Sequence, residues 1–181
     1  MKILLAFAHA VDRFTERLGH AVYWLSLFMV LIGAFNAVGR YMGRYIGADI
    51  TSNVFIEMQW YMFGALFLLG ASYTLKHDAH VRVDVLYGNL SKRNKTIINI
   101  AGAILFLLPF CILVQIVSWP AVFNSWHVWE QSPNPDGLPR YPIKTLIPIA
   151  FLLVTLQGLS GLIKDIASLR GIDPTPTAAE V

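Results

Sequence analysis

The sequence predicts an all-α membrane protein that crosses the bilayer with four helices. It holds four uncharged apolar stretches of about 18–21 residues, the number that a helix rising 1.5 Å per residue needs to cross a ~30 Å hydrocarbon layer. Of its 181 residues, 56% are hydrophobic and only 14% are charged, whereas about a quarter are charged in soluble domains. The predicted spans are Ala21–Gly39, Met58–Leu75, Ile97–Val117 and Thr145–Ile163. We expect one membrane domain over residues 1–172 and a disordered Pro- and Thr-containing tail over 173–181.

Basic residues predict how the four spans are oriented. Ten Lys and Arg residues fall on the side of the two termini and of the connection between the second and third spans, and four fall on the other side. An excess of positive charge marks the cytoplasmic side, so we expect both termini in the cytoplasm. The basic residues occupy helix ends rather than an aromatic-interleaved patch, which favours contact with lipid headgroups and argues against nucleic acid.

Residues 1–19 form an amphipathic pattern before the first span. Five apolar residues recur at spacings of 3, 4, 3 and 4, and the neighbouring charged residues fall elsewhere on the helical wheel. We therefore expect an interfacial helix that lies flat before the chain turns into the membrane. A cleaved signal peptide is the alternative. The apolar residues are Leu4, Phe7, Val11, Phe14 and Leu18.

The first two spans carry few polar residues. Asn36 lies deep in the first span, and its amide predicts a hydrogen bond to another helix. Thr51 or Ser52 is a suitable N-cap for the second span. Glu57 follows in the first turns of that helix, where its charge suits the helix dipole and lipid headgroups. A salt bridge from Glu57 to a partner subunit is the alternative.

The third span begins after a polar connection and contains two prolines. Residues 80–85 alternate polar and apolar side chains, a pattern too short to establish a strand. Pro109 predicts a kink in mid-membrane, because its ring removes a backbone hydrogen bond, and Pro120 marks the outer end of the span. Gln115 predicts an interhelical hydrogen bond.

The outer connection over residues 118–144 is the longest one and is rich in aromatic residues, Pro and Gly. Its prolines suppress helix, and its tryptophans suit the membrane surface. A rigid, aromatic loop of this kind suits contact with a partner, and a simple connector that follows the membrane surface is the alternative. The fourth span has Pro148 in its first turn and a small-residue seam near its end at Gln157, Gly158, Ser160 and Gly161.

The spans lack the residues that membrane chemistry needs. A bis-histidine haem needs His pairs at matched depth, but the five His residues lie at span edges or outside the spans. Proton-coupled pumps usually place a carboxylate or Lys within the hydrocarbon, and Glu57 is the nearest candidate. Cys111 is the only cysteine and has no partner for a disulfide or a metal site. We expect no cofactor, no metal and no catalytic site.

Two segments resemble the small membrane subunit, the Q subunit (DctQ-like), of tripartite ATP-independent periplasmic (TRAP) transporters. One starts at Glu57-Met58-Gln59-Trp60-Tyr61 and ends at His80-Val81-Arg82-Val83-Asp84; the other runs from Gly137-Leu138-Pro139-Arg140 through Lys144 to Gln157-Gly158-Leu159. The resemblance implies a subunit without a substrate or sodium site, which packs on the fixed frame of a large membrane subunit. That large subunit moves an organic acid inward with sodium, after a periplasmic binding protein captures the acid.

From the matching motifs we carry over candidates for a partner interface, and we add two residues of the outer loop. The candidates are Glu57, Trp60, Arg82, Asp84, Trp129, Glu130, Arg140 and Lys144. Two other functions stay open at this point. The chain could anchor a redox complex that holds haem or quinone, or it could be a small carrier that works alone.

Overall fold

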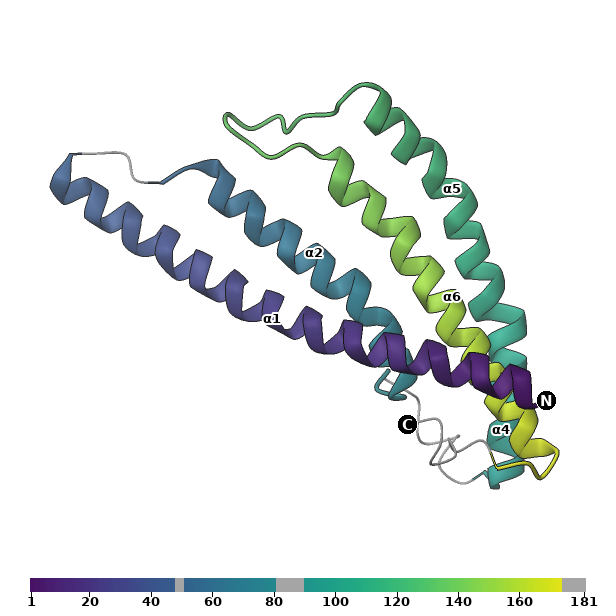
Figure 1. Cartoon of the computed structure of the whole chain (residues 1–181). Helices are drawn as coiled ribbons and strands as arrows, with labels where there is room; N and C mark the ends of the chain where they lie inside the picture. The colour runs from purple at the N-terminus through teal and green to yellow at the C-terminus, as the bar shows by residue number, and fades with distance from the viewer. Residues whose placement is uncertain (48–50, 81–89, 174–181) are drawn as a thin grey trace.

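A computed structural model describes residues 1–47, 51–80 and 90–173. Four helices in this part of the chain are long and apolar enough to cross a membrane, which confirms the predicted fold class. The first two are α1 (Lys2–Ile46) and α2 (Asn53–Lys76). The third combines α4 (Lys92–Gly102), a π-helical turn η1 (Ala103–Leu107) and α5 (Leu108–His127), and the fourth is α6 (Tyr141–Leu169). Figure 1 shows the helices converging near the N-terminus and fanning out toward their other ends.

Helix α1 joins the predicted interfacial segment and the predicted first span in one uninterrupted helix of 45 residues. The expected change of direction near residue 20 is therefore wrong, although the segment before it is helical as predicted. No proline lies between Lys2 and Ile46, and the ring of Tyr73 packs against Gly19. Of the polar residues in the amphipathic pattern, Asp12 and Thr15 contact α6 and Glu16 contacts the end of α2.

The ends of α2 follow the rules of helix capping. The Ser52 hydroxyl accepts a hydrogen bond from the Val54 amide at 3.2 Å, which confirms the predicted N-cap. At the other end, Asp78 adopts a left-handed backbone with φ of 55°. The Ala79 amide then donates to the Thr74 carbonyl at 3.1 Å, the closing bond of a Schellman motif. The alternating segment at 80–85 lies outside the described residues beyond His80.

The third helix contains a π-helical turn just before Pro109, where the sequence predicts a kink. Over Ala103–Leu107 the helix widens, and the Leu108 amide donates to the carbonyl of Ala103, five residues back. This turn immediately precedes Pro109 and makes room for the ring, which clashes with the carbonyl four residues earlier in a regular helix. Helix α5 continues through Pro120 to His127, ten residues past the expected end of the span. The outer loop is correspondingly shorter and covers residues 128–140.

Helix α6 packs against all the other long helices. Its small-residue seam is buried, with Gln157 2% exposed and Ser160 fully buried. Gln115 of α5 donates to the Pro148 carbonyl at 2.6 Å, which confirms the predicted interhelical bond. Asn36 is also buried, but its Oδ1 has no hydrogen-bond partner in the described residues. The hydrogen bond to another helix that was predicted for the Asn36 amide is therefore not formed by Oδ1 in this part of the chain.

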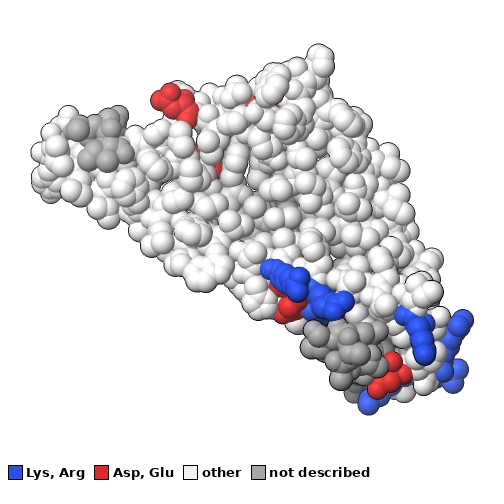
Figure 2. All heavy atoms as spheres, viewed as in Figure 1, with Lys and Arg blue, Asp and Glu red and all other residues white. Residues whose placement is uncertain are grey.

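Charge divides the molecule into two ends. On the face shown in Figure 2, Lys and Arg side chains gather at the lower end, and the middle of the molecule is uncharged. We call this the basic end; it contains Asp12, Glu16, Lys76, Lys92 and Lys164. The opposite end, formed by the start of α2, the end of α5, the outer loop and the start of α6, is called the aromatic end.

Candidate functional site

Glu57 holds the outer loop at the aromatic end. Its Oε1 accepts hydrogen bonds from the Asn134 amide nitrogen at 2.8 Å and from the Ser132 hydroxyl. Its Oε2 accepts from the Leu138 backbone amide at 2.6 Å. The residue is only 2% exposed. An apolar helix thus presents one buried carboxylate to the loop, and three loop donors satisfy it.

Close approach of the loop to α2 depends on Gly137. A Cβ at this position would lie 2.8 Å from Glu57 Oε2 and 2.3 Å from the Ser132 Cβ, distances that side-chain carbons do not tolerate. The Tyr61 hydroxyl, one turn further along the same side of α2, donates to the Pro139 carbonyl at 2.8 Å. Near the helix start, Asn53 donates to the Pro135 carbonyl at 3.1 Å. Contacts with α2 therefore fix the conformation of the outer loop.

Glu130 joins the end of α5 to the start of α6. Its Oε2 accepts a hydrogen bond from the Ser125 hydroxyl at 2.6 Å and forms an ion pair with Lys144. Its backbone carbonyl accepts from the Arg140 amide at 2.8 Å. The hydrogen bond from Lys144, followed by the one from Ser125, holds the pKa of the Glu130 carboxyl below its ordinary value. The carboxylate is thus stabilised in its charged form.

Three aromatic rings cover the surface of the loop. Trp126, Trp129 and Tyr141 have ring centroids 4.5–6.3 Å apart, and the Trp126 indole donates to the Thr145 hydroxyl at 2.8 Å. Trp129 has a left-handed backbone with φ of 48°, at the Schellman position where glycine is usual. Its side chain is nevertheless 62% exposed. A bulky, exposed residue thus occupies a backbone conformation that is strained for an L-residue.

Six of the eight predicted interface residues meet at the aromatic end. Glu130, Arg140, Lys144 and Trp129 belong to the loop and its borders, and Glu57 lies beneath it. Trp60, also on α2, is 60% exposed. Glu57 itself does not reach the surface, so any part it has in binding a partner acts through the loop. Arg82 and Asp84 lie outside the described residues.

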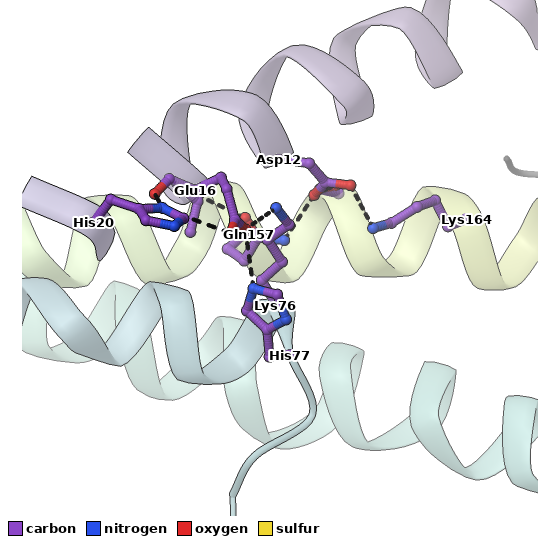
Figure 3. Close-up of polar contacts among 9 residues, drawn as sticks. Asp12, Glu16, His20, Lys76, His77, Gln157 and Lys164 are labelled. Atoms are coloured by element: carbon purple, nitrogen blue, oxygen red, sulfur yellow. Dashed lines mark hydrogen bonds and ion pairs between the residues drawn. The ribbon is translucent and has the colours of Figure 1, made fainter. Parts of the chain in front are cut away.

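A second polar cluster, which the sequence did not predict, joins α1 to α6 at the basic end (Figure 3). Asp12 Oδ2 pairs with the Lys164 ammonium at 2.7 Å. Its Oδ1 accepts from the Gln157 amide and the Ser160 hydroxyl, both at 2.8 Å. The Thr15 hydroxyl donates to Gln157 Oε1 at 2.8 Å. Each of these hydrogen bonds and the ion pair joins a side chain of α1 to a side chain of α6.

The same face of α1 also contacts α2 (Figure 3). Glu16 Oε2 accepts from the Lys76 ammonium at 2.5 Å and from His77 Nε2 at 2.9 Å. His20, one turn further along α1, lies with Nδ1 2.8 Å from the Glu16 carbonyl oxygen. The signal for this cluster was present in the sequence, in the polar stripe of residues 1–19 and in Lys76 and Lys164 at span ends. It indicated polar residues but not the helices that they face.

Neither cluster has the arrangement of a catalytic or metal site. In the described ranges, no group of three or more His, Cys, Asp and Glu residues could hold a metal ion. The carboxylates of both clusters accept hydrogen bonds from ammonium, amide and hydroxyl groups of the chain itself. These contacts hold the helices together at the basic end and hold the outer loop in place at the aromatic end.

Comparison with known protein families gives one match. The family described as the DctQ component of tripartite ATP-independent periplasmic transporters matches residues 29–168. No curated protein and no solved structure matches the chain. The matched range covers most of the four predicted spans and the entire outer loop.

Proposed function

We propose a structural role for this chain, which belongs to the DctQ family and is therefore a small membrane subunit of a tripartite ATP-independent periplasmic transporter. In our proposal it is a non-catalytic scaffold in the bacterial inner membrane. It packs on the large membrane subunit of a sodium-coupled organic acid importer and helps to dock the periplasmic substrate-binding protein. Both termini face the cytoplasm, so the aromatic end faces the periplasm, in keeping with the distribution of positive charge.

The observation that carries this proposal is how the chain uses its polar side chains. A site for an ion or a solute within a membrane needs polar groups that can coordinate it. Asp12 is bound by Lys164 and Gln157, and Gln115 is bound to a backbone carbonyl. Glu57 is bound by the loop. These polar groups hold the fold together, and that use favours a scaffold over a carrier.

The outward surfaces favour contact with apolar partners. Many large hydrophobic side chains of α1, α2 and α5 are more than half exposed, among them Phe28, Phe67 and Phe110. Such faces suit lipid tails and the helices of a larger membrane subunit. A transporter that moves one domain against another needs a fixed frame, and anchored helices with apolar faces widen that frame.

Reconstitution tests the scaffold role. The large subunit and the binding protein are placed in liposomes with and without this chain, under an inward sodium gradient, and uptake of the organic acid is followed. We expect uptake with all three proteins, little or none when this chain is left out, and none from this chain alone. Uptake by this chain alone would establish a stand-alone carrier. A Soret band in its absorption spectrum would instead support the redox-anchor alternative.

A second experiment tests docking at the aromatic end. Trp129→Ala removes the exposed indole, and we expect a weaker apparent affinity of the binding protein for the reconstituted membrane subunits, with unchanged assembly of those subunits. Trp119→Ala is the matched control, because Trp119 is also exposed but stacks on Phe123 of the same helix, away from the loop. Equal affinities for Trp129→Ala and the wild type would contradict docking at this surface.

A further inference from the structure

A cavity of about 630 Å³ lies at the basic end, between the last turn of α2, the α4–η1 segment and α6. It is open to the surface and adjoins the cluster of Figure 3, because Lys76, Gln157 and Lys164 form part of its wall. The rest of the wall includes apolar residues, among them Leu107 and Leu162. Neither the scaffold role nor docking at the aromatic end accounts for this cavity.

Glycines keep the cavity empty. Gly102 of α4 and Gly161 of α6 line it from two sides, and a Cβ added to either residue would meet nothing within 4 Å. The neighbouring Gly158, by contrast, is covered by the Leu107 side chain, whose Cδ2 would lie 2.7 Å from an added Cβ. Leu107 ends the π-helical turn, which locally displaces this wall of the third helix. The space between α4 and α6 thus lies beside Gly102 and Gly161, and the π-helical turn forms part of the cavity wall there.

The wall has the polarity of an amphipathic molecule. Lys76 and Lys164 line the cavity, together with Asp78 and Asp165. Lys76 is paired with Glu16 and Lys164 with Asp12. An ammonium has three hydrogens, and each ion pair uses one, so both lysines retain hydrogens that can donate to a phosphate. The site thus combines ammonium and carboxylate groups, which suits a headgroup that carries both signs of charge.

We propose that this cavity binds one phospholipid from the leaflet at the basic end. The lysine ammoniums hold its phosphate, and an acyl chain lies along Leu107 and Leu162. The inference goes beyond the scaffold function and does not depend on docking of the binding protein. A lipid held here fills the space between α2, the α4–η1 segment and α6.

Native mass spectrometry of the delipidated protein tests the proposal. The chain is titrated with phosphatidylethanolamine in detergent, and the wild type is expected to retain one molecule. Gly161→Leu places a side chain at a cavity-lining position where an added Cβ meets nothing within 4 Å, and we expect an affinity at least about tenfold weaker. Gly102→Leu fills the cavity from the opposite wall and carries the same expectation, so either variant suffices if the other fails to fold.

The control is Gly70→Leu, on α2. An added Cβ at Gly70 also meets nothing within 4 Å, but this residue lines a separate groove between α1 and α2. We expect wild-type affinity from it. Diacylglycerol, which lacks the phosphate, should not be retained, and inorganic phosphate alone should bind far more weakly than the phospholipid. Equal retention of phosphatidylethanolamine by the wild type and both cavity variants overturns the proposal. So does equal retention of diacylglycerol, or binding of inorganic phosphate as tight as that of the lipid.

Discussion

The two ends of the molecule use polar residues differently. At the basic end, Asp12 and Glu16 join α1 to residues of α2 and α6 that are 60 to 152 positions away in the sequence. At the aromatic end, Glu130 binds partners only 5 and 14 positions away, and Glu57 binds a single loop. The first set of contacts fixes how the helices cross, and the second fixes the shape of one connection.

This difference indicates that contacts at the basic end contribute most to the stability of the helix bundle. Helix α1 is fastened to its neighbours by ion pairs near its start, whereas its last residues project beyond them, with Tyr45 91% exposed. Figure 1 shows the same separation between the end of α1 and the tops of α5 and α6. Damage at the basic end should therefore weaken the whole fold. Damage at the aromatic end should affect the loop and what binds to it.

The largest effect is expected from Asp12→Ala. The substitution leaves Lys164 without its carboxylate and removes the acceptor of Gln157 and Ser160. Breaking a buried ion pair costs about 3–5 kcal/mol, and because the Asp12 side chain is 17% exposed we expect a loss of about 2–3 kcal/mol. Unfolding in mixed micelles measures it. Glu130→Ala is the matched variant at the other end, and a global loss as large as that of Asp12→Ala would break the comparison.

Gly19→Ala should have the next largest effect. The added Cβ would lie 2.1 Å from the Tyr73 ring, and overpacking of this kind costs about 1–3 kcal/mol. Gly70→Ala adds the same methyl group where nothing lies within 4 Å, and it should gain up to about 1 kcal/mol from helix propensity. The difference in melting temperature between the two variants is the measurement. Equal melting temperatures would show that α1 and α2 do not pack as described.

Trp129 allows a smaller test at the aromatic end. Both Trp129→Gly and Trp129→Ala lose the ring contacts, but only glycine relieves the left-handed backbone, which costs an L-residue about 1–2 kcal/mol. We expect the glycine variant to be the more stable of the two by about 1 kcal/mol. Thermal unfolding compares them directly. If alanine is equal to glycine or better, the strain assigned to this position is absent.

The smallest effect concerns pH and is confined to the loop. Because the pKa of Glu130 is lowered in the folded chain, its contribution is fully present above the unfolded value of about 4.3. It is lost as the pH falls through the lower folded value. Protease cleavage within residues 128–140 should therefore accelerate in strongly acidic buffer. Glu130→Gln should cleave faster already at neutral pH and should respond less to acid, and an identical acid response in both proteins would exclude Glu130 as the group responsible.

The sequence predicted the helices better than their contacts. Hydrophobic runs placed all four spans, because burial in lipid acts on each segment separately. Capping chemistry placed Ser52 as the N-cap, and the proline rule placed the irregularity next to Pro109. The predicted helix ends were less accurate than the predicted spans. Helix α5 extends to His127, because the residues after the apolar stretch continue the helix and hydropathy does not detect them.

Contacts between distant residues could not be predicted in the same way. Glu57 was expected to contact lipid headgroups or a partner subunit, whereas the structure buries it. Nothing local indicates that three donors of a loop some 80 residues later bind it. The pairing of Asp12 with Lys164 depends equally on the packing of α1 against α6. A helical wheel shows that Asp12 is on a polar stripe, and only the tertiary arrangement shows what the stripe contacts.

The length of α1 has a mechanical consequence. Its 45 residues form a rod of about 68 Å, more than twice the thickness of the hydrocarbon layer. The rod must lean steeply or extend into water on at least one side. Since no break separates its two halves, the projecting tip near Arg44 and the segment that carries Asp12 and Glu16 belong to one continuous helix.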